Sequence, residues 1–196
     1  MCENSSTFLD VFTDVSLSCG PVTLVVPTLA QTVELARLVH NGLFAPGEAN
    51  TVGSWYDSRH LTTTARSVVA KQMEAWRPTE QSRISLRFAI VVDGQVVGVQ
   101  SLGDTNAGPF RVSGELDTGS WLAPHMRGKR LAVPARLCAL HLAFDVLGAH
   151  AVVSEALTEN VASKQVSLRC GYVDDGRGID TTGGCTCLHL KAFPAQ

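Results

Sequence analysis

The stretch HMRGKRLAVPARL, residues 125–137, reads as a short basic loop that runs into an apolar helix. The loop carries the basic side chains of His125, Arg127, Lys129 and Arg130. The first N–H groups of a helix have no partner inside it and carry partial positive charge, so a helix start binds phosphates well. A solvated loop is the alternative, but cations are slightly unfavourable at a helix start. The residues therefore favour a phosphate or pyrophosphate site around Gly128.

Two familiar phosphate-binding motifs do not fit this loop. A P-loop needs G-x-x-x-x-G-K-[ST], whereas Gly128-Lys129 is followed by Arg130 and lacks the upstream glycine. The dinucleotide fingerprint G-x-G-x-x-G is also missing here. We therefore expect a phosphate-binding loop of another kind.

The composition is that of an ordinary globular protein. Of 196 residues, 45% are hydrophobic and 17% charged, which excludes a disordered chain or a coiled coil. The length suits one core, and we expect a single domain over residues 21–196, preceded by an arm or extra element over residues 1–20. The formal charge of −2 implies no general attraction to nucleic acid or anionic membranes.

The apolar runs are too short to cross a membrane, and the N-terminus lacks the features of a signal peptide. We therefore expect a cytoplasmic protein with reduced thiols. The cysteines are Cys2, Cys19, Cys138, Cys170, Cys185 and Cys187. No two form a C-x-x-C pair, so buried thiols are favoured over a metal site, and we expect no metal.

Hydrophobic periodicity and turn residues predict a mixed α/β domain without internal repeats. A capped helix begins at Thr28 and ends at Gly42, with an apolar stripe through Leu29, Val33, Ala36 and Val39. Asp93-Gly94 marks a hairpin turn. The expected strands are residues 22–27, 85–92, 95–102, 111–122, 149–157, 172–180 and 185–193. The expected helices are residues 28–42, 62–77, 131–147 and 160–171, and residues 43–58 form a loop.

Residues 119–172 resemble the GCN5-related N-acetyltransferases (GNAT), and within them the RimJ/RimL type. The matching positions are Gly119, Trp121 and Leu122 in the strand, Arg127, Gly128 and Ala132 in the loop, Phe144, Leu147 and Gly148 at the end of the long helix, and Asn160, Ser163, Gly171 and Tyr172 after it. The resemblance implies the GNAT fold, a central, mostly antiparallel twisted sheet that is split by a V-shaped opening and flanked by helices.

The resemblance also implies acetyl-CoA as the acyl donor. Its pyrophosphate would lie on the backbone amides from Arg127 to Ala132, and its pantetheine arm between the strands at residues 117–123 and 152–157. Backbone groups near Leu122 would hold the arm and could donate to the thioester oxygen. The candidate donor-binding residues are Trp121, Leu122, Ala123, Arg127, Gly128, Lys129, Arg130, Leu131, Ala132, Asn160 and Ser163.

The sequence departs from the family pattern at three positions. The family has Gln or Arg at His125, a small residue at Arg130 and often Glu at Pro134. The side chain of Arg130 could clash with the diphosphate, or it could turn outward and pair with the phosphate on the ribose. Proline is tolerated in the first helical turn.

Acyl transfer to an amine needs a base, because an ammonium group has no lone pair for attack on the thioester. Relatives often have Glu where this chain has Asp117, which makes Asp117 the first candidate, followed by Glu115 and Glu155. An exposed strand carboxylate is the alternative interpretation. The leaving thiolate could take a proton from Ser163 or Tyr172, although helix capping alone would also explain Asn160 and Ser163.

The sequence therefore predicts an N-acetyltransferase that moves the acetyl group to a primary amine of a small molecule or a protein N-terminus, by direct attack in a ternary complex. The acceptor would be gripped by residues 43–60, with Trp55 and Tyr56 as walls. One alternative is an acyl- or aminoacyltransferase that uses another acyl-CoA or an aminoacyl-tRNA. Another is a catalytically silent acyl-CoA-binding module. A homodimer is compatible with the sequence, which does not fix the oligomeric state.

Overall fold

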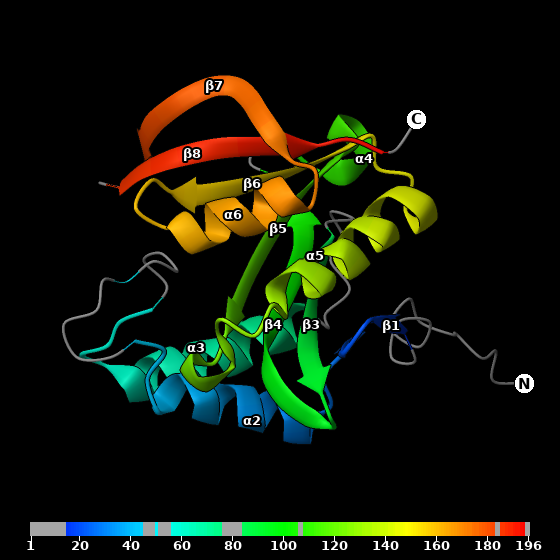
Figure 1. Ribbon diagram of the computed structural model, residues 1–196. Coiled ribbons are helices and arrows are strands. Elements are labelled where there is room, and N and C mark those ends of the chain that lie inside the picture. The colour runs from blue at the N-terminus through cyan, green and yellow to red at the C-terminus, as the bar shows by residue number, and fades with distance from the viewer. Residues whose placement is uncertain are drawn as a thin grey trace, which may run out of the picture.

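The computed structural model describes residues 15–44, 50, 56–75, 84–105, 108–182 and 185–194. These residues form one eight-stranded sheet with the order β1-β2-β3-β4-β5-β6-β8-β7 (Figure 1). The strands are β1 Ser16–Cys19, β2 Val22–Val25, β3 Ser85–Val92, β4 Gln95–Asp104, β5 Glu115–Leu122, β6 Ala151–Leu157, β7 Val173–Thr182 and β8 Cys185–Ala192. Neighbouring strands are antiparallel except β5 and β6, which run parallel. The mixed α/β class with a mostly antiparallel sheet is confirmed.

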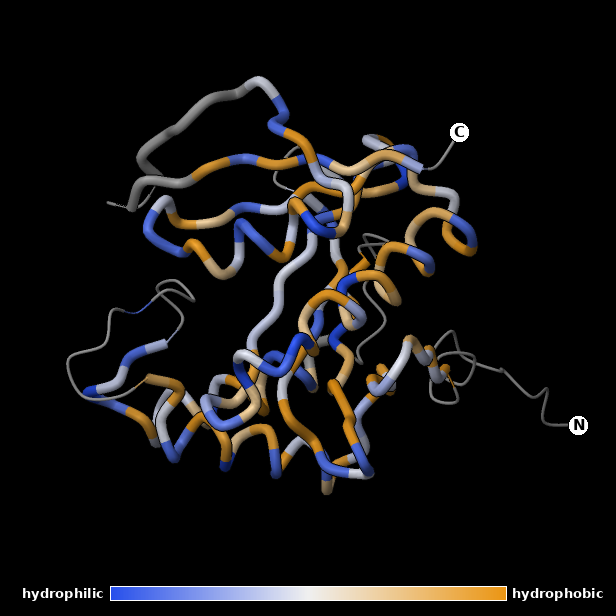
Figure 2. The backbone as a smooth tube through the Cα atoms, viewed as in Figure 1, coloured by the Kyte–Doolittle hydropathy of each residue, from blue (hydrophilic) through white to orange (hydrophobic). Residues whose placement is uncertain are grey.

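The helices are α2 Leu29–His40, α3 Leu61–Ala75, α4 Phe110–Ser113, α5 Ala132–His141 and α6 Val161–Arg169. A 3-10 turn at Pro124–Met126 precedes α5, and a π turn at Leu142–Val146 follows it. Helix α5 packs with Leu116 and Val152 in the main core, whereas α2 packs through Leu35 against Ala89 on the opposite face. The sheet therefore lies between two helical layers, and its β3–β4 hairpin is mostly apolar (Figure 2).

The sheet splits between its two parallel strands. Strands β5 and β6 pair only from Glu115↔Ala151 to Asp117↔Val153. Beyond that point β5 stays paired with β4 and β6 stays paired with β8, so the two strands part toward their C-terminal ends (Figure 1). This is the expected V-shaped opening, and it exposes backbone edges that a ligand can use.

Local sequence signals explain several element boundaries. Thr28 caps α2 in a capping box with Gln31, and Asn160 caps α6 as predicted. The Asp93-Gly94 turn joins β3 to β4, with both residues at positive φ as a two-residue hairpin requires. The end of α2 is also as expected, because Gly42 follows the helix at φ 95°.

Other expectations were wrong. The strand expected from residue 111 begins only at Glu115, because Phe110–Ser113 form a short helix that ends at Gly114 with φ 65°. The buried stripe of α2 is Thr32, Leu35 and Val39, while Leu29 and Val33 are exposed. Residues 16–19 add a strand to the sheet, and the division into residues 1–20 and a domain of residues 21–196 stays a prediction.

Candidate active site

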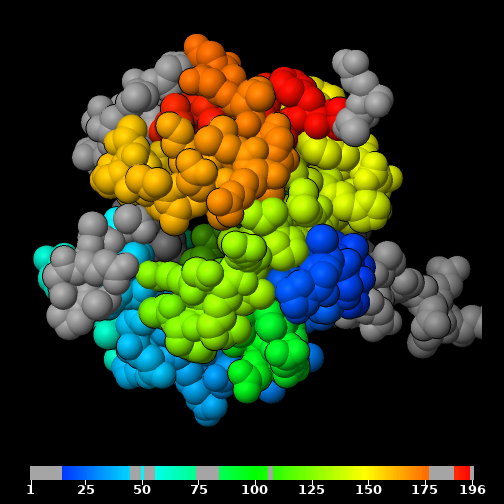
Figure 3. All heavy atoms as spheres, in the orientation of Figure 1, coloured from blue at the N-terminus to red at the C-terminus, as the bar shows by residue number. Residues whose placement is uncertain are grey.

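A cavity of about 940 Å³ follows the split between β5 and β6. Figure 3 shows the hollow between α6 and the segment that leads into α5. Its walls come from α3, from the strands beside the split, from the loop before α5 and from α6. The lining includes Lys71, Arg87, Thr118, Gly119, Ser120, Trp121, Leu122, Arg127, Gly128, Arg130, Leu131, Ala132, Arg136, Ser154, Glu155, Glu159, Asn160 and Ser163. The cavity therefore joins most of the expected donor site to the split sheet.

The loop before α5 presents backbone donors to this cavity. Gly128 has φ 72° and open space where a Cβ would stand. Leu131, the N-cap of α5, makes no side-chain cap. Among the hydrogen bonds of the described residues, none is donated by the backbone N–H of Gly128, Lys129, Arg130 or Leu131. Free N–H groups at a helix start, close to cations, fit a diphosphate.

Arg130 occupies a left-handed conformation, with φ 60°. Glycine adopts this conformation without strain, whereas in other residues the Cβ comes too close to the backbone carbonyl oxygen. The backbone conformation thus favours glycine at this position. Arg130 lines the cavity, and Lys129 points elsewhere, with its Nζ 3.6 Å from the Sδ of Met126.

Arg127 holds the loop to the rest of the protein. Its Nε donates to the carbonyl of Leu122 at 3.2 Å, and one terminal nitrogen donates to the carbonyl of Leu43 at 2.6 Å. Its guanidinium carbon also lies 4.9 Å from the centre of the Phe44 ring. Arg127 is therefore a positioning residue as well as part of the cavity wall.

The C-terminal end of β5 supplies the strand side of the expected donor site. Trp121 and Leu122 line the cavity, while Ala123 is fully buried and donates its N–H to the carbonyl of Val97. Gly98 of β4 lies against this end, and a Cβ on Gly98 would run into the backbone oxygen of Trp121. The close approach of β4 therefore fixes the backbone that would hold the pantetheine arm.

Asn160 and Ser163 form the cap of α6 at the opposite wall. The Asn160 side chain accepts from the backbone N–H of Ser163 at 3.0 Å, and both residues line the cavity. Asn160 is thus the N-cap of α6, as predicted, and its role in donor binding stays a prediction. A role of Ser163 toward the thiolate stays a prediction.

The three candidate carboxylates lie in different surroundings. Glu155 lines the cavity and lies 3.5 Å from the Nδ1 of buried His189. Glu115 pairs with the Nζ of Lys191 at 2.6 Å. Asp117 is half-buried on the same face of the sheet as Glu155, and neither it nor Glu115 lines the cavity.

Burial raises the pKa of Asp117 to about 6, and the nearby charge of Glu155 adds to this shift. Arg136 and a backbone hydrogen bond at Thr118 act in the opposite direction. A carboxyl with a pKa near 6 is mostly ionised at neutral pH and can still accept a proton readily. Asp117 therefore has the electrostatics of a general base.

Two further candidates, Tyr172 and Tyr56, are not among the residues that line the cavity. Tyr172 is buried, its hydroxyl lies 2.9 Å from the Oγ1 of Thr118, and its pKa is raised mainly by burial. Tyr56 is buried beside Val39 and accepts from the N–H of Leu43, so the structure does not bring it to the cavity wall. Trp55 lies outside the described residues.

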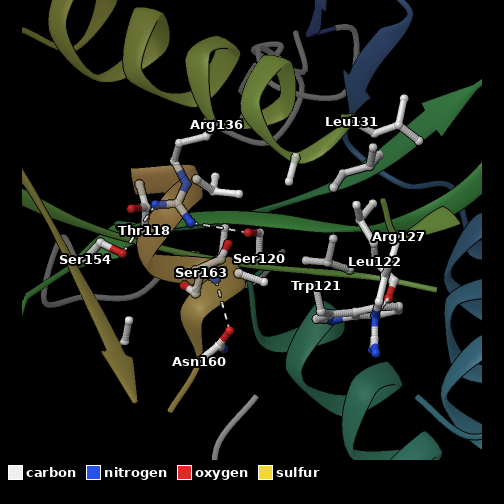
Figure 4. Close-up of a pocket in the computed structure, with 18 of the residues that line it drawn as sticks. Thr118, Ser120, Trp121, Leu122, Arg127, Leu131, Arg136, Ser154, Asn160 and Ser163 are labelled. Atoms are coloured by element: carbon white, nitrogen blue, oxygen red, sulfur yellow. Dashed lines mark hydrogen bonds between the residues drawn. The ribbon is translucent and has the colours of Figure 1, made fainter. Parts of the chain in front are cut away.

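Sequence reasoning missed one residue at the centre of the site. Arg136 projects from α5 toward the split, between Thr118, Ser120 and Ser154 (Figure 4). It is only 2% exposed. The signal was present, because Arg136 is the one charged residue in the otherwise apolar stretch from Leu131 to Leu140.

A mostly antiparallel sheet that splits between its two parallel strands, beside a loop with free backbone N–H groups at a helix start, is the arrangement expected of the GNAT acetyltransferase fold. The chain matches the acetyltransferase (GNAT) domain over residues 34–173. It therefore belongs to the GNAT acetyltransferase family, as the sequence motifs implied.

Solved structures with the same fold include RimJ from Mycobacterium smegmatis in complex with CoA-disulfide. That protein is 21% identical with a TM-score of 0.66, and the match covers 91% of this chain and 86% of that one. The ribosomal-protein-S5-alanine acetyltransferase from Vibrio fischeri is 15% identical with a TM-score of 0.64, covering 92% and 97%. The microcin C7 self-immunity acetyltransferase MccE, in complex with acetyl-CoA and AMP, is 17% identical with a TM-score of 0.66, covering 89% and 93%.

The described residues contain neither a membrane-spanning helix nor a metal-binding cluster. No helix among them has the length and apolar character needed to span a bilayer. They also contain no group of three or more His, Cys, Asp or Glu side chains arranged to hold a metal ion. The thiols of Cys19, Cys138 and Cys170 are free, with Cys138 and Cys170 buried and Cys19 half-buried.

Proposed function

We propose that this protein transfers the acetyl group of acetyl-CoA to a primary amine of a small molecule or a protein N-terminus. The observation that carries the proposal is the continuity of one cavity from the free N–H groups before α5 to the split between β5 and β6. The two substrates would meet in the split as a ternary complex. A cytoplasmic location remains part of the proposal.

The donor would lie along the α5 and α6 side of the split. Backbone N–H groups from Gly128 to Ala132 would bind its diphosphate, and the free edge of β5 near Leu122 would bind its pantetheine arm. The complexes of RimJ with CoA-disulfide and of MccE with acetyl-CoA support a CoA thioester as the donor, because both proteins share the fold. Arg130, at the cavity wall, would face the phosphates.

The chemistry is a direct exchange of one bond for another. The amine nitrogen bonds to the thioester carbonyl carbon, the carbon–sulfur bond breaks, and CoA leaves as a thiol. The amine proton would pass to Asp117, through water because Asp117 stands behind the cavity wall, with Glu155 beside it at the surface of the cavity. Ser163, which lines the cavity whereas Tyr172 does not, would relay a proton to the thiolate and take one back from water, and Asp117 would release its proton to solvent.

The acceptor would approach from the face that carries Asp117 and Glu155. A protein N-terminus is supported by the shared fold of an enzyme named for ribosomal protein S5 alanine, and a small molecule by MccE. The acceptor side of the split therefore holds the acid–base residues, and the donor side holds the phosphate loop.

The test is release of CoA thiol from acetyl-CoA across a panel of primary amines and N-terminal peptides. We expect Asp117→Asn to slow turnover by about 100-fold or more while CoA still binds. Asp93→Asn, in the β3–β4 turn, is the matched control and should keep wild-type turnover. Tight CoA binding without thiol release from any amine would favour a silent binding module. Transfer only from another thioester, or from aminoacyl-tRNA, would identify a different donor.

A further inference from the structure

Arg136 is a buried cation at the point where the sheet opens. Its guanidinium nitrogens donate to the Oγ of Ser120 at 3.2 Å, the Oγ of Ser154 at 3.3 Å and the Oε1 of Gln100 at 3.4 Å (Figure 4). The guanidinium carbon lies 5.7 Å from the centre of the Tyr172 ring. An arginine that is only 2% exposed is unusual, because charged side chains are rarely buried without an opposite charge.

The hydrogen-bond partners place this cation at the vertex of the split. Ser120 belongs to β5 and Ser154 to β6, and both follow the last paired residues, Asp117 and Val153. The guanidinium thus spans the two strands just where their pairing has ended. It also lines the cavity, so a bound molecule can reach it.

The partners of Arg136 satisfy hydrogen bonds but do not neutralise its charge. Hydroxyl and amide oxygens are neutral, and among the described residues no carboxylate oxygen lies within 4.0 Å of the guanidinium. Asp117 acts on it only through space, from the other face of the sheet. The site therefore has a desolvated positive charge for which the described part of the chain supplies no ion pair.

The phosphates of the donor do not account for this charge. Arg136 lies one helical turn beyond Ala132, about 6 Å further along α5 than the start of the helix. The loop before α5 already supplies backbone N–H groups and Arg130 for phosphate binding. The cavity as a whole is cationic, since its wall carries Lys71, Arg87, Arg127, Arg130, Arg136 and Arg169 against Glu155 and Glu159.

We propose that Arg136 is a specificity-determining residue that binds a carboxylate carried by one of the two substrates at the split. A carboxylate matches the planar fork of a guanidinium and is small enough for a closed vertex. It would come from the amine, or from the far end of a longer acyl chain, in which case the preferred donor is a dicarboxylic acyl-CoA and not acetyl-CoA. The inference rests on the proposed function for the identity of the two substrates.

Equilibrium titration of the full-length chain tests the inference in two arms. The donor arm compares succinyl-CoA with butyryl-CoA, which have acyl chains of the same length and differ in the terminal carboxylate. The acceptor arm compares glutamate with glutamine, and glycine with glycinamide, on protein loaded with CoA. We expect a preference of at least about 10-fold for the carboxylate in one arm, as for other charge-assisted contacts, and that arm identifies the source.

Variants of Arg136 then connect the preference to this side chain. Arg136→Met should reduce the preference to within about 3-fold, and Arg136→Lys, which keeps the charge but not the fork, should retain part of it. Arg169→Met is the matched control, because it removes another cation of the cavity wall and should keep the preference. Circular dichroism melting shows whether each variant is folded, and Arg136→Gln replaces Arg136→Met if the latter is not.

Three outcomes would overturn the inference. One is equal affinity for both members of every pair in the wild-type protein. Another is a preference that persists in the folded Arg136 variants. The third is an equal loss of affinity for charged and neutral ligands, which would make Arg136 a structural residue. Because both arms measure binding, absence of thiol release with an intact preference would reject the proposed function and leave this inference standing.

Discussion

Arg130 combines a charged side chain with a backbone conformation that favours glycine. Its φ of 60° lies in the left-handed region, which costs about 1–2 kcal/mol for a residue with a Cβ. The family usually has a small residue at this position. In this chain an arginine places a positive charge at the cavity wall, and its backbone is strained. A single substitution at Arg130 can measure the free-energy cost of this strain.

We expect Arg130→Gly to raise the free energy of unfolding by about 0.5–1 kcal/mol, because relief of strain exceeds the extra chain entropy of glycine. Urea denaturation measures the change. Lys129→Gly is the matched control, since it removes the same charge from a residue without positive φ and should bring no gain. Equal effects of the two substitutions would show that Arg130 is not strained.

If Asp117 is the base, its ionisation determines how kcat/KM falls on the acidic side, or acid limb, of the pH profile. Because its pKa is about 6, kcat/KM should fall as the pH falls through this value. Glu155 raises this pKa by its negative charge, so Glu155→Gln should move the limb to lower pH. Initial rates between pH 4.5 and 8 provide the measurement.

Glu159→Gln serves as the control for that profile. Glu159 also lies at the cavity wall but is not among the causes of the shift at Asp117, so its loss should leave the limb in place. A limb that stays fixed in Glu155→Gln, or moves to higher pH, would contradict the assignment of Asp117.

Strand β4 fixes the end of β5 through a close backbone contact. A Cβ at Gly98 has no space beside the Trp121 carbonyl, so Gly98→Ala must push β5 away from β4. We expect a loss of about 2 kcal/mol or more in the free energy of unfolding, together with weaker CoA binding. Thermal melting and CoA titration check the two effects.

Gly103→Ala in the same strand is the milder comparison. Its Cβ would stand 3.1 Å from the backbone oxygen of Ile84, remote from the end of β5, so CoA binding should persist. Stronger loss of CoA binding in Gly103→Ala than in Gly98→Ala would show that the Trp121 contact does not position the donor site.

Elements with strong local signals could be predicted, and elements fixed by distant contacts could not. The α2 capping box, the hairpin around Asp93-Gly94 and the Asn160 cap are readable because turn and cap chemistry acts within a few residues. The helix at Phe110–Ser113 replaces a predicted strand start, because local alternation there does not reflect burial. Val112 is in fact 83% exposed.

The residues of the candidate site also fall into those that could be predicted from the sequence and those that could not. The loop around Gly128 could be located from its residues, and the motifs indicated the family. Arg136 could not be assigned a role, because its partners Gln100, Ser120 and Ser154 come from three strands far apart in the sequence. The buried stripe of α2 was misplaced for a similar reason, since two helical faces were apolar enough to pack.

At the scale of the whole molecule, the split sheet leaves a large cavity that a donor would fill. A ligand that binds only the folded state stabilises it by about 2.7 kcal/mol at a concentration 100 times its Kd. For a chain of this length, the melting temperature should rise by about 5–10 °C with CoA at that concentration. Scanning fluorimetry across a CoA series measures the shift.

Gly128→Glu should abolish the CoA-dependent shift, because it places a carboxylate where the diphosphate would lie. Gly148→Glu is the matched control, since Gly148 also has positive φ and open space but stands outside the cavity wall. Both variants carry similar backbone strain, so loss of the shift in both would mean that the loop around Gly128 is not the phosphate site.

The hydrogen bond from the Arg127 guanidinium to the Leu43 carbonyl has a consequence for how the two substrates bind. Leu43 begins the connection between α2 and α3, on the side from which we expect the amine to arrive, while Arg127 belongs to the loop that would bind the donor. Coupling between two binding sites is reciprocal, so a loop fixed by the donor also fixes the entrance for the amine. We therefore expect the kinetics to be sequential, with each substrate raising the affinity of the protein for the other by the same factor.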